Sequence, residues 1–223
     1  YAAVAVIIAY LIILSGNYPT GTDTLGYLYK GNMLYDAMGK GDWYPLYDSL
    51  WFNGVQTMRY QAPLPVYFLA FCQWIAGGND LDGYLVFVAL VFYLGALVWL
   101  YIGCRSNRPG LGAFLGMLWF FIPNNLYILF GEGNLPRVLA LVWMPLWLHW
   151  ISAYLLEDDA KALTKAVPVF TMMVLCETEF AVMISAAMLL FLLIYRLLYH
   201  RKGKCLPVIG AMLVAFLITG IWL

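Results

Sequence analysis

Residues 16–65 read GNYPTGTDTLGYLYKGNMLYDAMGKGDWYPLYDSLWFNGVQTMRYQAPLP and form the only long polar interval in the chain. Apolar sequence lies on both sides of the interval, and the whole chain is 64% hydrophobic and only 11% charged. Apolar runs of about 18 or more residues are typical of membrane-spanning helices. We therefore predict an all-α protein, a polytopic transmembrane helix bundle that residues 1–223 form as a single domain. Residues 15–62 are predicted to be its first external loop, carrying an amphipathic helix at the membrane surface.

The apolar segments set the expected number of helices that cross the membrane. About seven segments read as spans or parts of spans, namely 1–14, 84–103, 110–123, 138–156, 166–176, 180–199 and 206–223. Residues 63–76 are too few for the roughly 20 that a spanning helix needs, so we predict a re-entrant or interfacial helix there. The sequence begins without Met inside one apolar run and stops inside another, so we expect a portion of a longer membrane protein.

Two ways of threading the chain through the membrane compete. Lys and Arg favour the cytoplasmic side. If residues 63–76 cross, the polar interval is cytoplasmic, and the basic residues are then more strongly biased to that side. If they do not cross, the basic loops near Arg105, Lys161 and Arg201 share the cytoplasmic face, and the polar interval lies outside. We prefer the second arrangement, because the segment is short and begins with two prolines, and because four acids then share one face: Asp23, Glu132, Glu177 and Glu179.

The composition excludes several classes of function. The formal net charge is zero, so there is no electrostatic basis for a nucleic-acid partner. The four cysteines show no CxxC spacing, and the two histidines are too few for a histidine-based metal centre. We therefore predict neither a disulfide framework nor a zinc site.

The polar interval contains a recognisable order of features. Asp23 follows an apolar helix, residues 25–38 form a weakly amphipathic stretch, and an aromatic block leads through residues 63–67 into the next apolar segment. With Trp43-Tyr44-Pro45 and Asn53-Gly54 in the block, this order resembles the first external loop of GT-C-class polytopic glycosyltransferases, over residues 1–150. The chain is also similar to bacterial membrane proteins described as 6-pyruvoyl-tetrahydropterin synthase-related. Many GT-C enzymes carry a paired acid in this loop, whereas Asp23 is flanked only by threonines.

The resemblance implies a transferase that moves a sugar from a polyprenyl-phosphate-linked donor to an acceptor at the extracytoplasmic face. Such a reaction needs a base for the acceptor hydroxyl. We predict Asp23 in that catalytic role, because a partly desolvated carboxylate at the membrane rim suits it. The alternative is that Asp23 or Thr22 caps the helix that starts near Thr24. The expected location is the cytoplasmic membrane of a bacterium or archaeon.

Glu132 lies between glycines at a predicted helix start and is expected to face Asp23 across the same rim. It is a candidate for orienting the acceptor, or for holding a divalent cation together with Asp23 through oxygen ligands. Alternatively, its charge stabilises the positive end of the helix that begins near Leu135. Glu177 and Glu179 interrupt apolar sequence, where ionisable groups are usually functional or paired unless they are solvated at the rim.

Further candidates for binding the substrate are basic and aromatic. Arginine recognises a phosphate with two hydrogen bonds, so Arg59 beside Tyr60 is the first choice for the leaving phosphate. Alternatively, Arg59 extends toward the lipid headgroups. Arg137 and Lys30 are the other basic candidates on this face. Trp43 belongs to the aromatic block, which either stacks on sugars or anchors the protein in the membrane interface. The block comprises Trp43, Tyr44, Tyr47, Trp51 and Phe52.

Two other classes of function remain open. A transporter or lipid flippase is expected to carry ionisable residues in mid-span and broken helices in corresponding halves, whereas the acids here lie near predicted helix ends. A non-catalytic assembly protein would use the loop only to bind a partner. Membrane lipid is an expected partner in each case.

Overall fold

The computed structural model describes residues 1–16, 19, 21–48, 54–56, 58, 59, 62–199 and 202–220. Within them the protein is helical, apart from turns and an isolated antiparallel bridge between Asp48 and Val55. The elements in chain order are α1 (Ala2–Ser15), α2 (Thr24–Gly39), α3 (Leu64–Ile75), α4 (Asp80–Arg105), α5 (Pro109–Trp119), α6 (Pro123–Leu126), the π-helix η1 (Tyr127–Glu132), α7 (Leu135–Leu156), α8 (Ala160–Cys176), α9 (Thr178–Tyr199) and α10 (Lys202–Thr219). The prediction of an all-α polytopic bundle is confirmed.

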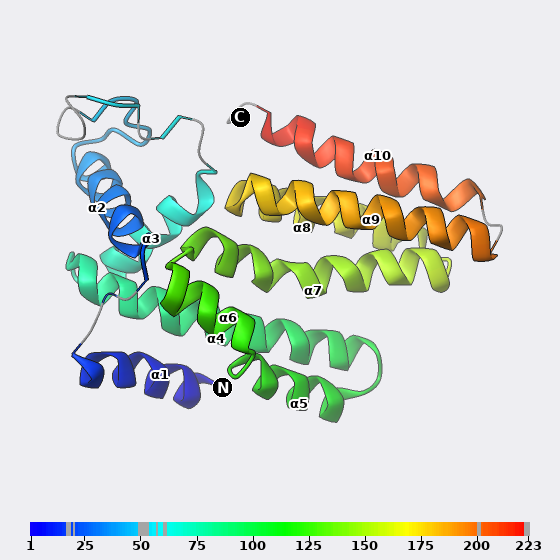
Figure 1. The fold of residues 1–223 in the computed structure, drawn as a ribbon, viewed down its shortest axis with the longest axis horizontal. Helices are drawn as coiled ribbons and strands as arrows, with labels where there is room; N and C mark the ends of the chain where they lie inside the picture. Colours follow the sequence, from blue (N-terminus) through cyan, green and yellow to red (C-terminus); the bar gives the residue numbers. More distant parts are fainter. Residues whose placement is uncertain are drawn as a thin grey trace.

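The long helices run back and forth along one axis of the molecule (Figure 1). Four stretches are long and apolar enough to cross a membrane: Asp80–Arg105, Pro109–Glu132, Leu135–Leu156 and Thr178–Leu198. The other three expected spans correspond to α1, α8 and α10, and these are shorter, with 14, 17 and 18 residues. The span predicted at residues 110–123 extends further, to Glu132. Helix α5 ends at Trp119, and after a short turn Pro123 occupies the first turn of α6, where a missing N–H is tolerated.

Helix α3 does not cross the bundle. Figure 1 shows α2, α3 and the first turn of α4 together at the end of the molecule where α1 finishes. Gln73 on α3 fixes this arrangement, because its side-chain amide donates to Asn32 Oδ1 at 2.7 Å and to the Gly78 carbonyl at 2.9 Å. The chain therefore enters α4 from the same end at which it left α1. This placement agrees with the threading in which residues 63–76 do not span.

Two hydrophobic clusters hold the long helices together. One joins α1, α3, α4, α5 and the first half of α7, and the other joins the second half of α7 with α8, α9 and α10. Glycines allow α4 and α5 to approach closely, because a Cβ at Gly112 would lie 2.7 Å from Gly103 Cα and 2.8 Å from the Trp99 carbonyl oxygen. Small residues at such crossings are the usual means by which membrane helices pack.

The two ends of the bundle differ in chemistry. At one end lie the acidic breaks between α1 and α2, between η1 and α7, and between α8 and α9 (Figure 1). At the other end lie the α4–α5 turn, the α7–α8 turn and the start of α10. There the Lys204 ammonium pairs with Asp158 and donates to the Leu155 carbonyl at 2.9 Å. The bundle thus presents one acidic end and one end that carries most of the basic turns.

Candidate functional site

The start of α2 is fixed to the break between η1 and α7. The backbone N–H of Asp23 donates to the Glu132 carbonyl at 3.0 Å, and the Thr22 hydroxyl donates to the same oxygen at 2.8 Å. Glu132 is the last residue of the π-helix, a form that occurs mostly as single turns and often at functional sites. Two residues that lie far apart in the sequence are thereby brought together, as predicted for Asp23 and Glu132.

Two glycines make this close contact possible. Gly133 adopts φ +73°, and a Cβ there would lie 2.7 Å from the backbone nitrogen of Thr24. Gly21 adopts φ +94°, and its Cβ would lie 2.5 Å from the backbone nitrogen of Gly133. Left-handed backbone and absent side chains are needed at both positions, so the joint between the two loops is built for glycine.

The Asp23 carboxylate is exposed, although the residue occupies the N-cap position of α2. Its side chain makes no capping hydrogen bond, and its backbone carbonyl accepts from the Tyr27 N–H at 3.2 Å. The side chain of Asp23 therefore does not cap α2. The backbone of Asp23 is held while its carboxylate is left available to another molecule.

Tyr27 and Lys30 continue the same face of α2. Burial raises the pKa of Tyr27 to about 12, and the negative charge of Asp23 contributes to the rise. The Lys30 ammonium lies 5.6 Å from the centre of the Tyr27 ring. Burial lowers the pKa of Lys30, and the charge of Asp23 opposes that change. Lys30 is therefore partly removed from water, whereas the Asp23 carboxylate that acts on it is exposed.

Arg137 is held by two acids from other elements. Its guanidinium donates to Glu177 through Nε at 3.1 Å and through Nη2 at 2.9 Å, and its Nη1 lies 3.5 Å from Glu132 Oε2. Asn134 supports the pair, since its amide donates to Glu177 at 3.2 Å and its oxygen accepts from the Arg137 N–H at 3.0 Å. The Glu177 side chain is 12% exposed. Arg137, expected to bind phosphate, is thus largely neutralised by the protein itself.

The sequence left pairing and solvation at the rim open for Glu177, and the structure shows that Glu177 is paired. The sequence did not identify Arg137 as its partner. Tyr27 and Asn134 were also missed. Neither carries a motif, and only the tertiary contact between the two loops gives them a place in the site.

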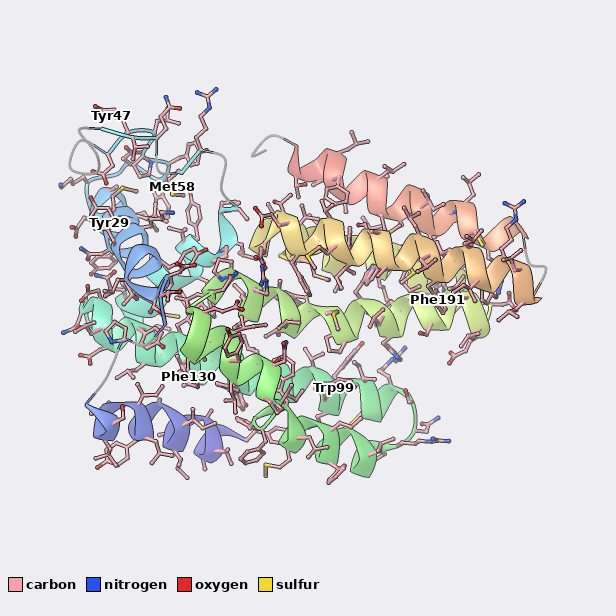
Figure 2. The ribbon with its side chains drawn as sticks, in the orientation of Figure 1. Tyr29, Tyr47, Met58, Trp99, Phe130 and Phe191 are labelled. Carbon is pink, nitrogen blue, oxygen red and sulfur yellow. The ribbon has the colours of Figure 1, made fainter. Side chains whose placement is uncertain are left out.

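Two further candidates, Arg59 and Trp43, lie toward the far end of α2. Met58 packs against Leu34, which lies about 15 Å along the helix from its start at 1.5 Å per residue. Arg59 follows Met58 and donates to Gln56 Oε1 at 2.8 Å. Figure 2 shows Met58 close to α2 and the loop above it. Arg59 therefore does not join the cluster around Asp23.

Trp43 lines a separate cavity of about 640 Å³ between the end of α2 and α3. Its side chain is 63% exposed, and its backbone carbonyl accepts from the Tyr67 hydroxyl at 2.5 Å. Phe71 and Trp74 of α3 form another wall of this cavity. Tyr60, Trp51 and Phe52, which were also named from the sequence, lie outside the described residues.

A divalent cation between Asp23 and Glu132 does not fit this arrangement. Glu132 directs its carboxylate to Arg137, which leaves Asp23 as the available oxygen ligand of the two. Within the described part of the chain, no group of three or more His, Cys, Asp or Glu side chains is placed to hold a metal ion.

Comparison with known proteins identifies the family. Residues 58–223 match the model of a family described as 6-pyruvoyl-tetrahydropterin synthase related domain, membrane protein. No curated protein and no solved structure matches the chain. The matched part is well over half of the chain and includes Glu132, Arg137 and Glu177, whereas Asp23 and α2 precede it. The chain therefore belongs to the 6-pyruvoyl-tetrahydropterin synthase related family of membrane proteins.

Proposed function

We propose that this protein is a GT-C-type glycosyltransferase that moves a sugar from a polyprenyl-phosphate-linked donor to an acceptor at the extracytoplasmic face. The observation that carries the proposal is that Asp23 has a fixed backbone and an exposed carboxylate. Its backbone is bonded to the Glu132 carbonyl at the acidic end of the bundle, while its carboxylate is exposed and makes no capping bond. A general base requires such a carboxylate, fixed in position and free to accept a proton.

The reaction assigns a role to each group around Asp23. The acceptor hydroxyl gives its proton to the Asp23 carboxylate as its oxygen bonds to the anomeric carbon of the donor. The bond from that carbon to the phosphate oxygen breaks, and the electron pair leaves with the phosphate. Lys30 is the cation suited to meet this phosphate, because it lies on the same face of α2 as Asp23 and in the field of that carboxylate.

The exposed carboxylate of Asp23 lies beside groups that are partly buried. Burial is the main cause of the raised pKa of Tyr27, one turn of helix away. The joint between Gly21 and Gly133 places these groups without further movement, which favours a preorganised site over one assembled on binding.

The proposed orientation follows from the distribution of charge. The turns at the end opposite Asp23 carry Arg105, Arg108 and Lys161, and basic turns favour the cytoplasmic side. The Asp23 end then faces outward, where lipid-linked sugars are consumed in the proposed reaction. The membrane concerned is the cytoplasmic membrane of a bacterium or archaeon.

The test compares two aspartates at the same end of the bundle. The full chain is reconstituted in vesicles with labelled polyprenyl-phosphate sugars and membrane-derived acceptors, and the formation of glycosidic product is measured. Asp23→Asn is expected to lower the rate about 100-fold or more, as for loss of a general base. Asp82→Asn, an exposed acid in the first turn of α4, is expected to keep the rate within about twofold.

Three outcomes would contradict the proposal. If Asp23→Asn forms the glycosidic product at an unchanged rate, Asp23 does not take part in the reaction. Movement of the labelled lipid between the two sides of the vesicle without a glycosidic product indicates a transporter. Binding of a partner protein through residues 15–62, with neither activity, indicates an assembly protein.

A further inference from the structure

A second cavity lies at the end of the bundle opposite Asp23. It has a volume of about 490 Å³ and is formed by the α4–α5 turn together with the end of α7. Trp99 of α4 is one of its walls, and Figure 2 shows this residue in the half of α4 nearer the turn, far from Tyr29 and Met58. Nothing in the proposed transfer reaction uses this cavity.

The cavity has a polar and an apolar part. Arg105, Arg108 and Glu157 provide charge at the level where the spans end, whereas Ile102 and Leu115 line the part within the spans. Two guanidinium groups outweigh one carboxylate, so the polar part is positively charged. Basic pockets between membrane helices at the membrane surface are suited to lipid headgroups, with the apolar wall taking the first carbons of the chains.

The turn that carries the arginines is held firmly. The Arg108 N–H donates to the Gly103 carbonyl at 2.7 Å, and Asn107 adopts a left-handed φ of 55° to close the turn. Arg105 is placed by Trp150, since its guanidinium lies 5.8 Å from the centre of that buried ring. Arg108 occupies the N-cap position of α5, where the positive end of the helix dipole adds to its charge.

We propose that this cavity binds a phosphate group, carried by a membrane lipid. Arg105 and Arg108 engage the phosphate through charge-assisted hydrogen bonds. The apolar wall formed by Ile102 and Leu115 receives the beginning of the chains. The site is independent of Asp23, so its test does not depend on the proposed transfer reaction.

The experiment measures binding to the purified full chain in neutral detergent. Three probes are compared: phosphatidylglycerol, diacylglycerol, which lacks the phosphate, and inorganic phosphate. Bound molecules are counted by native mass spectrometry, and affinity is taken from titration. Phosphatidylglycerol is expected to bind at least about tenfold more tightly than diacylglycerol, because only the former makes the charge-assisted bonds. Inorganic phosphate that binds as tightly as the lipid would identify free phosphate as the source of the same group.

Three variants locate the binding. Arg108→Gln is expected to weaken the binding of phosphatidylglycerol about tenfold. Lys161→Gln removes the same charge from an exposed position at the start of α8, at the same end of the bundle, and is expected to leave the affinity within about twofold. Arg105→Gln removes the other guanidinium of the cavity and is expected to weaken binding about tenfold as well.

The proposal is overturned by any of three results. If diacylglycerol binds as tightly as phosphatidylglycerol, the phosphate is not what the cavity recognises. If Arg108→Gln and Lys161→Gln lose the same affinity for phosphatidylglycerol, the binding is only a general attraction of anionic lipid by the basic turns. If Arg108→Gln does not fold, Arg105→Gln decides, and an affinity within twofold of the unaltered protein rejects the site.

Discussion

Single residues show how two acids at similar breaks in the sequence come to differ. Asp23 keeps its carboxylate exposed, whereas Glu177 is 12% exposed in its side chain and is bonded twice by Arg137. The difference lies in the group that each break contacts. The start of α2 contacts the backbone carbonyl of Glu132, whereas the break between α8 and α9 contacts the guanidinium of Arg137. One acid is thus available for chemistry, and the other holds helices together.

The Arg137–Glu177 pair is expected to stabilise the fold measurably. Arg137→Gln leaves Glu177 without its charged partner in partly buried surroundings, at a cost of about 2 kcal/mol. For a chain of this size such a loss lowers the unfolding temperature by roughly 4–8 °C. Asp36→Asn is the control, because Asp36 is exposed on α2, and it is expected to change the temperature by less than about 2 °C.

Thermal unfolding in detergent measures both changes. The double variant Arg137→Gln, Glu177→Gln is expected to lose less than the sum of the single losses, since neither charge is then left alone. Additive losses would show that the two side chains are not coupled.

Tyr27 predicts a loss of stability at high pH. In the folded protein Tyr27 has a pKa of about 12, whereas in the unfolded chain a tyrosine has its ordinary pKa of 10.0 and loses its proton at lower pH. Between these values the folded state binds more protons than the unfolded state, so its stability falls as the pH rises. Tyr27→Phe is expected to make that decline shallower in unfolding measured from pH 9 to 12. Asp23→Asn is expected to lower the pKa of Tyr27, because the charge of Asp23 helps to raise it.

At the scale of elements, the attachment of α2 to the η1–α7 break is the feature on which the site depends. Gly133→Ala introduces left-handed strain and a contact with the Thr24 backbone. Gly16→Ala introduces comparable strain at φ +66° with nothing within 4 Å of the new Cβ, and so serves as the control. We expect a loss of about 1 kcal/mol for Gly16→Ala and about 3 kcal/mol for Gly133→Ala.

Hydrogen exchange provides the second measurement for this pair of variants. Gly133→Ala is expected to speed exchange of the α2 amides, because the helix loses its anchoring contact, whereas Gly16→Ala leaves them unchanged. Equal exchange in both variants would show that α2 does not depend on the joint.

Much at the element scale was predictable from the sequence. The amphipathic helix in the polar interval is α2, and the short helix with prolines at its start is α3, because both follow from local patterning. Of the candidate site, the proximity of Asp23 and Glu132 was predicted from topology. The pairing of Arg137 with Glu177 was not, since it joins residues 40 positions apart that no local pattern links. The separation of Arg59 and Trp43 from Asp23 likewise depends on the direction of α2.

For the whole molecule, the path of the chain makes a prediction about accessibility. Thr22→Cys and Asp82→Cys flank α3 and are expected to react with a membrane-impermeant thiol reagent from the same side of intact cells. Asn107→Cys is expected to react with the same reagent only when the reagent is supplied on the opposite side of the membrane. A background with Cys104→Ser is needed, because Cys104 is the exposed native thiol. Opposite accessibility of Thr22→Cys and Asp82→Cys would mean that α3 passes through the membrane.

The position of α3 also has a mechanical consequence for the bilayer. Phe71, Trp74 and Ile75 expose 48%, 66% and 49% of their surfaces at one end of the bundle only. Apolar side chains at that height displace lipid from one leaflet while the other is left undisturbed. The cross-section of the protein is therefore larger in one leaflet, as in a wedge. Such a wedge fits best where the membrane curves away on that side, so the lateral distribution of the protein is expected to follow curvature.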